Sequence, residues 1–335
     1  MKLSQIGELL LLDQIRKRFK KKSKNILIGI GDDAAVLKPI DKNLLVTTDM
    51  MVEDVHFDLG FITPYQLGFK LISVNVSDVY AMGGKPSYLL LDIAVKKDMD
   101  TKFIISLFDG VKDAINLYDT FLIGGDLSDT NIGMALSATV IGCVKRHIPR
   151  SGAKIGDKIY VTGKLGDSAC GLELLKKIKR PVPIQKKRST FNVQRLTKNL
   201  GLSWNVVEPL LRRHLMPEAR DPKKFVTHAT SMIDISDGLL IDLWRLCDES
   251  KVGARIYIEK IPVSFELKKA ASYLGISPIK LALSGGEDYE LLFTAPDRKK
   301  IEAVHIGEIT KSERLIVDSS GKEKSFTAKG YQHFK

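Results

Sequence analysis

Cysteine is scarce in this sequence: among 335 residues there are three, Cys143, Cys170 and Cys247. They lie far apart, are odd in number and form no CxxC pair. A disulfide framework and a structural zinc site are therefore not expected. The remaining interpretation is that the three thiols are small buried side chains.

Long hydrophobic runs are also missing. The first apolar run is four leucines between Glu8 and Asp13, which is too short and too acidic for a signal peptide. No later segment approaches the roughly 20 apolar residues that a membrane-spanning helix needs. We therefore expect a cytoplasmic protein without membrane contact.

Several nucleotide-site and catalytic motifs are absent as well. The sequence contains no GxxxxGK(S/T) loop, no HRD or DFG of protein kinases and no GxSxG elbow. The stretch GIGDDA, residues 29–34, does not fit GxGxxG. These absences argue against a P-loop nucleoside triphosphatase, a protein kinase, an α/β hydrolase and a dinucleotide-binding enzyme.

Acidic residues are outnumbered, and the net charge is +12. The excess is concentrated in two acid-free stretches, residues 16–24 and 176–188, which hold seven Lys or Arg each. The rest of the chain is close to neutral, and no aromatic-rich RNA motif or zinc finger accompanies the basic stretches. We interpret both stretches as solvated faces and expect no nucleic-acid partner; a surface for nucleic acid or an acidic partner is the alternative.

Length and pattern predict two α/β domains. With 44% hydrophobic and 27% charged residues, the chain can form a large core and is long enough for two domains. Strand-like and helix-like segments alternate through the first half, and turn glycines with a new strand begin near Arg150. We place the domain boundary there, which gives residues 1–149 and 150–335.

Local signals define several elements. An amphipathic helix is expected over residues 8–20 and a strand over residues 44–49. Thr63 and Pro64 begin a helix by capping and first-turn chemistry, and Gly83 and Gly84 stop it. That helix is apolar nearly all round, so we expect it to be buried.

Acids recur at the ends of predicted strands, beside glycine or hydroxyl residues. One such acid is ordinary, since Asp caps helices and closes turns, but nine acids in six such stretches exceed what capping explains. The acids are Asp32, Asp33, Asp49, Asp78, Asp126, Asp234, Asp237, Glu287 and Asp288.

Asp78 is the most demanding of these acids, because it lies within the apolar helix that begins at Thr63. An unpaired carboxylate buried there would cost several kcal/mol. Asn75 is three residues earlier on the same face and could share a ligand or a hydrogen-bonding role with it. The alternative is a buried pair of Asp78 with a lysine.

Oxygen ligands without paired cysteines favour Mg²⁺, Ca²⁺ or Mn²⁺ over zinc or copper. Mg²⁺ usually takes one or two carboxylates and completes its coordination with water and phosphate oxygens, so this many acids predicts several ions. The loops GIGDD, IGGD and LSGGED add backbone N–H groups that can approach phosphate closely. The residues by themselves indicate a magnesium-dependent enzyme that uses a nucleotide triphosphate, outside the P-loop class.

At this point the sequence resembles the thiamine-monophosphate kinase family, within the aminoimidazole-ribonucleotide-synthetase-like (PurM-like) superfamily. The resemblance rests on motifs spread over residues 29–334: GIGDDAAVL, TTDMMVEDVHF, KLISVNVSDVYAMGG, LIGGD, RSGAKIGDKIYVTGKLGDSA, IDISDGLLIDL, LSGGEDYELLFT and KGYQHF. It implies a two-domain α/β (α+β) fold with an N-terminal mixed-sheet domain that pairs with its copy in a homodimer. It also implies a C-terminal α/β domain and an ATP site in the cleft between the domains.

The resemblance implies an activity, the transfer of the γ-phosphoryl group of ATP directly onto the phosphate of thiamine monophosphate. Matching motif positions imply Mg²⁺ ligands at Asp33, Thr47, Thr48, Asp49, Asp78, Asp126, Asp234 and Asp237. They imply ATP contacts at Gly125, Asp126, Arg150 and Ser236, and substrate contacts at His56 and Glu287. The expected catalytic residues are Asp49, Asp78, Asp126, Arg150 and Asp237. Asp32 would orient its turn or hold a metal-bound water.

Each of these roles has a plainer alternative. His56 would be an ordinary core or surface histidine, Glu287 a loop-capping acid, and Arg150 half of an interdomain salt bridge. One position departs from the family pattern: where an aromatic residue often precedes KGYQHF, this chain has Ala328. Phe326 or another aromatic residue could take its place against the substrate ring.

Two other functions stay open. The first is another ATP-dependent enzyme of the superfamily, of the aminoimidazole ribonucleotide synthetase or hydrogenase-maturation type. The second is a non-catalytic protein that binds magnesium nucleotide or thiamine phosphate.

Overall fold

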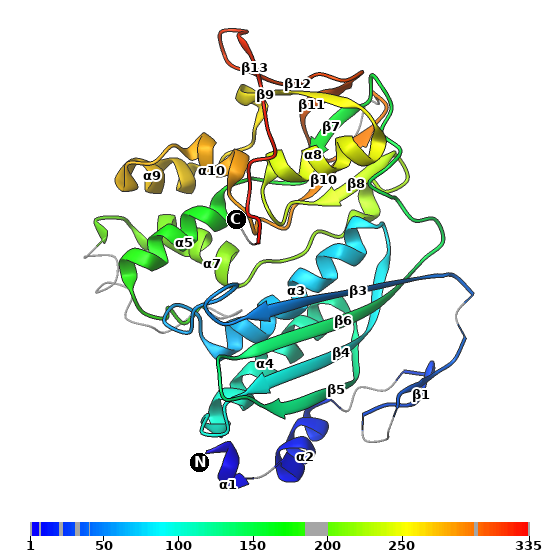
Figure 1. Ribbon diagram of the computed structural model, residues 1–335, viewed down its shortest axis with the longest axis vertical. Coiled ribbons are helices and arrows are strands. Elements are labelled where there is room, and N and C mark those ends of the chain that lie inside the picture. Colours follow the sequence, from blue (N-terminus) through cyan, green and yellow to red (C-terminus); the bar gives the residue numbers. More distant parts are fainter. Residues whose placement is uncertain are drawn as a thin grey trace. The chain divides into compact units, whose positions relative to one another are not determined.

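The computed structural model describes residues 2–6, 8–19, 23–30, 34–39, 41–184, 200–297 and 301–333. The chain separates into two compact units, each with a sheet of its own (Figure 1). Unit 1 comprises residues 1–79, 84–146 and 179–189, and unit 2 comprises residues 80–83, 147–178 and 190–335. The domain boundary between residues 149 and 150 stays a prediction.

Unit 1 contains a mixed four-stranded sheet in the order β3-β6-β4-β5, in which β4 and β5 are parallel and the other pairs are antiparallel. Figure 1 shows α3 and α4 on the same face of this sheet. The strands are β3 (Asn43–Val52), β4 (Lys85–Val95), β5 (Phe121–Asp129) and β6 (Ala135–Val144). The helices are α1 (Leu3–Ile6), α2 (Glu8–Arg18), α3 (Pro64–Ala81) and α4 (Thr101–Tyr118). A separate small sheet pairs β1 (Ile26–Ile28) with β2 (Val36–Leu37).

Two glycines let α3 and α4 cross in close contact. A Cβ atom added at Gly68 would overlap the carbonyl oxygen of Leu107, and one added at Gly110 would overlap the carbonyl oxygen of Tyr65. Backbone therefore faces backbone at the crossing. Beside it, the Tyr65 hydroxyl donates to Asp113 Oδ2 at 2.5 Å. This contact holds the helix that carries Asp78.

Unit 2 is built on a mixed seven-stranded sheet in the order β13-β12-β9-β11-β7-β10-β8. Its strands are β7 (Lys158–Val161), β8 (Ser231–Asp234), β9 (Gly253–Tyr257), β10 (Leu291–Ala295), β11 (Val304–Thr310), β12 (Arg314–Val317) and β13 (Glu323–Ser325). The helices are α5 (Asp167–Ile178), α7 (Trp204–Leu215), α8 (Leu239–Ser250), α9 (Phe265–Leu274) and α10 (Pro278–Ser284). The described part of unit 2 also contains the short 3-10 turns η1 (Pro222–Lys224) and η2 (Ile258–Lys260).

The sheet of unit 2 is buried on both faces around β10. Leu292 joins a cluster that includes Leu243 of α8, whereas Phe293 points to the other face and stacks on Phe225 with ring centroids 4.3 Å apart. Alternating side chains along one strand therefore contribute to two cores. This double burial fixes β8 and β10, whose adjoining loops carry the candidate site residues of unit 2.

Most of the expected elements are present, with some boundaries corrected. The helix signalled by Thr63 and Pro64 is α3, and it is buried along most of its length. The prediction that a strand ends at Asp49 is wrong, because β3 pairs with β6 as far as Val52. Asp126 likewise lies within β5 rather than at a strand exit. An exposed polar residue can pair in a sheet as well as an apolar one, so strand ends cannot be read from apolar runs alone.

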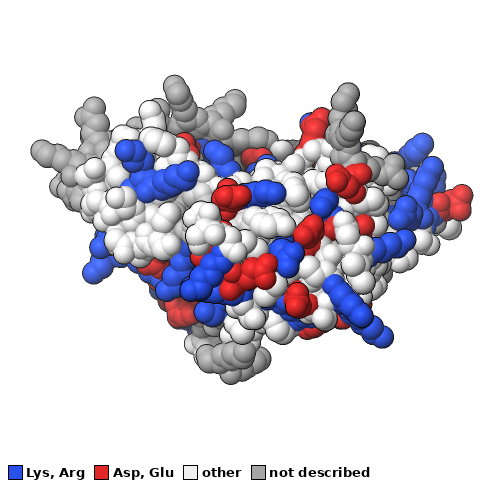
Figure 2. Space-filling model, turned by 90° about the horizontal axis from the view of Figure 1, so that it is seen from above, with Lys and Arg blue, Asp and Glu red and all other residues white. Residues whose placement is uncertain are grey.

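Several expectations drawn from composition can also be compared with the structure. Within the described ranges, no helix is long and apolar enough to cross a membrane. Cys170 and Cys247 are buried, and burial raises the pKa of each thiol to about 12, whereas Cys143 is half-exposed. Figure 2 shows a face on which acidic and basic side chains are interspersed. Residues 20–22 and 185–188 of the basic stretches lie outside the described residues, as does the remainder of the segment 185–199.

Candidate active site

The first group of predicted site residues lies where β3 meets α3 in unit 1. Thr47 Oγ1 donates to Asp78 Oδ2 at 2.7 Å. Asn75 Oδ1 accepts from the backbone N–H of Asp49 at 2.8 Å, and Asn75 Nδ2 donates to the Leu71 carbonyl at 2.9 Å. The structure thus brings Thr47, Asp49 and Asp78 together, and Asn75 acts as a link between helix and strand.

Thr48 and Asp126 lie on the opposite face of the same sheet. Side chains alternate along a strand, so the Thr48 side chain points away from those of its two neighbours; its hydroxyl lies 3.4 Å from that of Ser137 on β6. Asp126 pairs in register with Asp92, which in turn pairs with Ser137. The structure therefore does not place all the predicted metal ligands of unit 1 on one face.

His56, Gly125 and Arg150 have different settings. His56 Nδ1 accepts from the backbone N–H of Val52 at 3.0 Å, so Nε2 carries the hydrogen of the neutral ring. Gly125 has a φ of +148°, and an added Cβ would overlap the carbonyl oxygen of Leu91. Glycine is therefore required there by the pairing of β5 with β4. Arg150 is exposed on unit 2.

Three segments that are far apart in the sequence meet in unit 2. The backbone N–H of Glu287 donates to the Ser236 carbonyl at 2.6 Å, and the N–H of Tyr331 donates to the Asp237 carbonyl at 3.0 Å. A Cβ atom added at Gly286 would lie only 2.6 Å from the Ser236 carbonyl oxygen. The structure thus joins a predicted ATP contact, a predicted metal ligand and a predicted substrate contact within one unit.

Asp237 also forms an ion pair with an arginine of the same unit. Arg245 Nη1 donates to Asp237 Oδ2 at 2.7 Å and to Asp242 Oδ1 at 2.8 Å. Asp242 Oδ2 accepts from the N–H groups of Asp237 and Gly238 at 3.1 Å each, which caps the start of α8. Burial raises the pKa of Asp242 to about 6 against the opposing effect of Arg245. Asp234, the last residue of β8, is buried.

Asp288 serves the fold. It is fully buried and accepts from the backbone N–H groups of Gly166 at 2.6 Å and Ser168 at 3.2 Å, so it caps α5 from a segment 120 residues away. Burial raises the pKa of Asp288 to about 7. Its role is therefore to hold the start of a helix, which is a common use of Asp.

Glu290 is structural as well, whereas Glu287 is accessible. Glu290 is fully buried and accepts from Arg220 at 2.9 and 2.7 Å, and it also pairs with Arg213. Burial disfavours its charged form, but the two guanidinium groups outweigh burial and lower the pKa of Glu290. The Glu287 side chain keeps 29% of its surface exposed. Among the three acids of this loop, Glu287 is the one that a ligand can reach.

The donor chemistry in both units fits Mg²⁺. The oxygen donors are Thr47, Asp49 and Asp78 in unit 1 and Asp234 and Asp237 in unit 2. Within the described part of the chain, no three His, Cys, Asp or Glu side chains gather closely enough to hold a metal ion. Because Mg²⁺ usually takes only one or two carboxylates and completes its shell with water and phosphate, pairs of acids suffice. Asp32 and the predicted ligand Asp33 lie outside the described residues.

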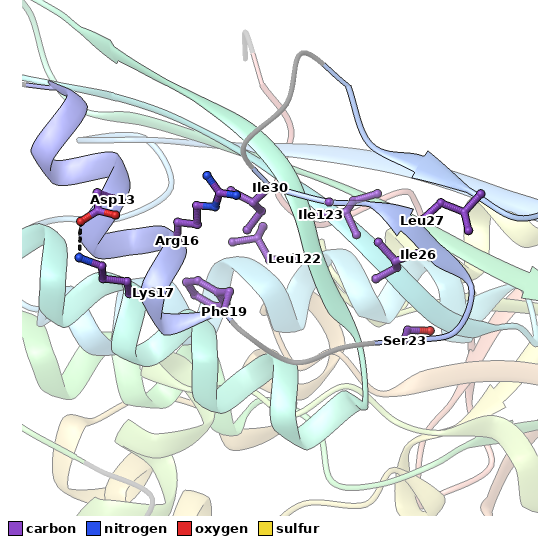
Figure 3. Close-up of a pocket in the computed structure, with 11 residues that line it drawn as sticks. Asp13, Arg16, Lys17, Phe19, Ser23, Ile26, Leu27, Ile30, Leu122 and Ile123 are labelled. Atoms are coloured by element: carbon purple, nitrogen blue, oxygen red, sulfur yellow. Dashed lines mark ion pairs between the residues drawn. The ribbon is translucent and has the colours of Figure 1, made fainter.

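A separate hollow in unit 1 contains none of the predicted site residues. Figure 3 shows it beside α2 and β5, with Ile26, Ile30 and Leu122 among its lining residues. The ion pair of Asp13 with Lys17, at 2.5 Å, lies on the α2 side. Its lining residues distinguish this hollow from the candidate active site.

The aromatic residue missing at Ala328 is not supplied by Phe326. The Phe326 ring is only 4% exposed and packs edge-on against Trp244, with centroids 6.1 Å apart. Tyr331 is 47% exposed and is joined through its backbone to Asp237. Of these two aromatic rings, Tyr331 is therefore the one available to a ligand of unit 2.

Sequence reasoning missed three residues of this region. Tyr331 lies in the KGYQHF motif, which could have indicated it. Arg245 follows Asp242 by three residues on α8, so helical spacing could have suggested their ion pair. His214, whose ring lies 3.0 Å from Glu287, carries no local signal, because the contact joins residues 73 positions apart.

Two family descriptions match the chain in sequence order. "AIR synthase related protein, N-terminal domain" matches residues 31–144, and "AIR synthase related protein, C-terminal domain" matches residues 154–319. The two matched ranges include every predicted site residue except Arg150, which lies between them.

Full-length relatives are more specific. The chain is 36% identical to the thiamine-monophosphate kinase of Aquifex aeolicus (strain VF5), covering 100% of both chains, and 34% identical to that of Escherichia coli (strain K12), covering 98% of both. A solved structure described as "AaThiL complexed with AMPPCP and TMP" has a TM-score of 0.74 at 35% identity, covering 100% of this chain and 99% of that one. The predicted two-domain α/β fold of the superfamily, with mixed sheets, is confirmed. The chain belongs to the thiamine-monophosphate kinase family.

Proposed function

We propose that this protein transfers the γ-phosphoryl group of ATP onto the phosphate of thiamine monophosphate, giving thiamine diphosphate and ADP. This reaction is the last step of thiamine diphosphate biosynthesis. The observation that carries the proposal is full-length similarity to thiamine-monophosphate kinases at 34–36% identity. The meeting of Ser236, Asp237 and Glu287 in unit 2 supports it.

The main physical obstacle to this reaction is repulsion between two phosphate groups. Bound Mg²⁺ would supply the positive charge that offsets this repulsion and stabilises charge in the transition state. The residues that would hold it are Asp33, Thr47, Thr48, Asp49, Asp78, Asp126, Asp234 and Asp237. Asp126 and the Thr48 side chain lie on the face of the sheet opposite Asp49 and Asp78. Asp126 would therefore hold a different ion from that pair, and we propose that Thr48 contributes its backbone carbonyl.

The protein's own groups would hold the phosphates in line. The exposed Arg150 guanidinium offers a planar fork of donors that matches phosphate oxygens. Gly125 and Ser236 would contribute close backbone approach beside ATP. The acceptor phosphate is already a nucleophile at pH 7, so no strong general base is required. Positioning and charge neutralisation would therefore account for the catalysis.

The organic part of the substrate would be recognised by three side chains. Thiamine carries a cationic ring, and the accessible carboxylate of Glu287 complements it. The exposed ring of Tyr331 could stack on it in place of the aromatic residue that Ala328 replaces. His56 would donate from Nε2, since its Nδ1 is occupied by the backbone of Val52.

We also propose that unit 1 pairs with a second copy through the outer face of its sheet. Leu44, Val46 and Met50 of β3 are 57%, 68% and 58% exposed. They alternate with the residues that face α3, so they share one face. Large apolar side chains gathered on one face mark an interaction surface. The nucleotide site between the two domains and the boundary at residues 149 and 150 are likewise proposals.

Incubation of the purified protein with ATP, Mg²⁺ and thiamine monophosphate tests the activity. We expect thiamine diphosphate and ADP in equal amounts, and an aminoimidazole-ribonucleotide-synthetase-type enzyme would instead leave the thiamine phosphate unchanged.

We expect Asp49→Asn to lower turnover by about 100-fold or more. Because Asp49 is exposed, the free energy of unfolding of the variant protein should differ from that of the wild type by no more than about 0.5 kcal/mol.

Two outcomes would count against this proposal. A folded wild-type protein that binds ATP without forming product would indicate the non-catalytic alternative. Equal losses of turnover and stability in Asp49→Asn would indicate a structural acid.

A further inference from the structure

We propose that His214 is a positioning residue that orients Glu287 toward the cationic, organic part of the substrate, an inference that rests on the proposed function. His214 is the penultimate residue of α7, and its Nδ1 lies 3.0 Å from Glu287 Oε2. A carboxylate without a proton can only accept hydrogen bonds, so Nδ1 carries the hydrogen of this contact. His214 is 12% exposed in its side chain, which places it behind the more exposed Glu287.

The backbone around Glu287 is already fixed, so the side chain is what remains to be oriented. Glu287 and Tyr289 have φ values of +65° and +49°, a region that non-glycine residues seldom occupy. Hydrogen bonds from their N–H groups to the carbonyls of Ser236 at 2.6 Å and Ile235 at 2.9 Å hold this conformation. A backbone held in such a conformation by its surroundings is typical of functional sites.

His214 is itself held in place. Its Nδ1 lies 3.1 Å from the hydroxyl oxygen of Ser168, a fully buried residue of α5. A Cβ atom added at Gly171 of α5 would overlap the Leu210 carbonyl oxygen and lie 3.2 Å from the His214 Cβ. Gly171 therefore lets α7 approach α5 closely enough for the imidazole to contact both Ser168 and Glu287.

The end of α7 contacts the acidic loop at two places. Arg213, next to His214, pairs with the buried Glu290. The two adjacent residues of the helix thus hold Glu290 and Glu287 on either side of Asp288. Arg213 anchors the loop through Glu290, and the His214 contact acts on the direction of the Glu287 carboxylate, which is the more accessible one.

The geometry separates two substitutions of His214. The amide nitrogen of Asn can take the place of Nδ1, whereas that of Gln lies nearer the position of Nε2. We expect His214→Ala and His214→Gln to raise the KM for thiamine monophosphate by about 5- to 20-fold, with the KM for ATP within about twofold. His214→Asn should stay within about threefold of the wild type. The measurement is steady-state formation of thiamine diphosphate, with each substrate varied in turn.

A double-mutant cycle tests whether His214 acts through Glu287. In a Glu287→Gln background, we expect His214→Ala to have less than about a twofold further effect on the KM for thiamine monophosphate, since the shared interaction is already lost. Glu208→Gln is the matched control on the same helix: the Glu208 side chain is 25% exposed and pairs with Arg212 at 2.5 Å, and the variant should behave as the wild type.

Several outcomes would overturn the inference while leaving the proposed function intact. They are an unchanged KM for thiamine monophosphate in His214→Ala and His214→Gln, an equal rise in both KM values, equal effects of Asn and Gln, or additive effects in the double mutant. Failure of His214→Ala to fold leaves the decision to the comparison of Asn with Gln. A wild type that forms no thiamine diphosphate would instead overturn the proposed function, and this inference with it.

Discussion

Asp288 and Glu287 are neighbours in the chain, but one is fully buried and the other keeps 29% of its side chain exposed. The buried carboxylate of Asp288 accepts hydrogen bonds from the backbone N–H groups of Gly166 and Ser168. The Glu287 carboxylate contacts His214 and stays partly exposed. At the scale of single residues, burial therefore separates the acid that builds the loop from the acid that can bind a ligand.

The burial of Asp288 predicts a pH dependence of stability. Burial raises the pKa of Asp288 to about 7, whereas the pKa of an Asp in the unfolded chain is about 3.9. Between these values the folded protein binds more protons at this group than the unfolded chain, so the free energy of unfolding falls as pH rises. We expect the wild type, measured against Asp288→Asn, to lose about 2 to 4 kcal/mol between about pH 4 and pH 7.

Urea unfolding of both proteins at several pH values measures this difference. The difference should be largest below about pH 4 and level off above about pH 7. Asp98→Asn, a substitution of an exposed acid, serves as the matched control and should show no such trend. A difference that stays constant would show that folding does not shift the pKa of Asp288, and one that rises with pH would show that folding lowers it.

At the scale of elements, the crossing of α3 and α4 sets two effects of one substitution against each other. Replacing Gly110 by Ala in α4 should favour the helix by up to about 1 kcal/mol. The added methyl group would, however, overlap the Tyr65 carbonyl oxygen, which is backbone and cannot turn aside. Forcing a methyl group into a packed contact costs about 1 to 3 kcal/mol or more. We therefore expect Gly110→Ala to lower the free energy of unfolding by about 1 to 3 kcal/mol.

Asn116→Ala is the control for this prediction, because it changes an exposed position of the same helix. It should leave the free energy of unfolding unchanged or raise it slightly. Denaturant unfolding of the three proteins provides the comparison. A Gly110→Ala protein as stable as Asn116→Ala would mean that the helices can move apart at little cost.

The elements also show how far the sequence could be interpreted. Pro64 and the pair Gly83 and Gly84 act on the residues beside them, so the bounds of α3 were predictable, as were the family and its two-domain fold. The cap that Asp288 provides for α5 was not, because its partners lie about 120 residues away. A contact such as that of His214 with Glu287 depends on how two helices pack, and no local pattern encodes it. Motif matching indicated Glu287 but not the residue behind it.

At the scale of the whole molecule, the sheet of unit 1 has two unlike faces. One face packs against α3, where Met51 of β3 is only 4% exposed. On the other face, Val46 is 68% exposed and has Leu44 and Met50 as neighbours along the same strand. Covering a row of exposed apolar side chains removes apolar surface from water, and each fully covered side chain contributes about 1.5 to 3 kcal/mol. The difference between the two faces is the physical basis of the proposed homodimer.

Val46→Glu tests this pairing. A charge at the centre of the apolar row would be buried without a partner if the two sheets meet, so we expect a dimeric wild type and a largely monomeric variant. Because the Val46 side chain is exposed in the single chain, the substitution should leave the secondary structure unchanged. Sedimentation equilibrium of the wild type and variant measures the masses. Ile155→Glu, at a residue of unit 2 that is 65% exposed, is the matched control and should remain dimeric. A Val46→Glu protein as dimeric as the wild type would mean that any pairing uses another surface.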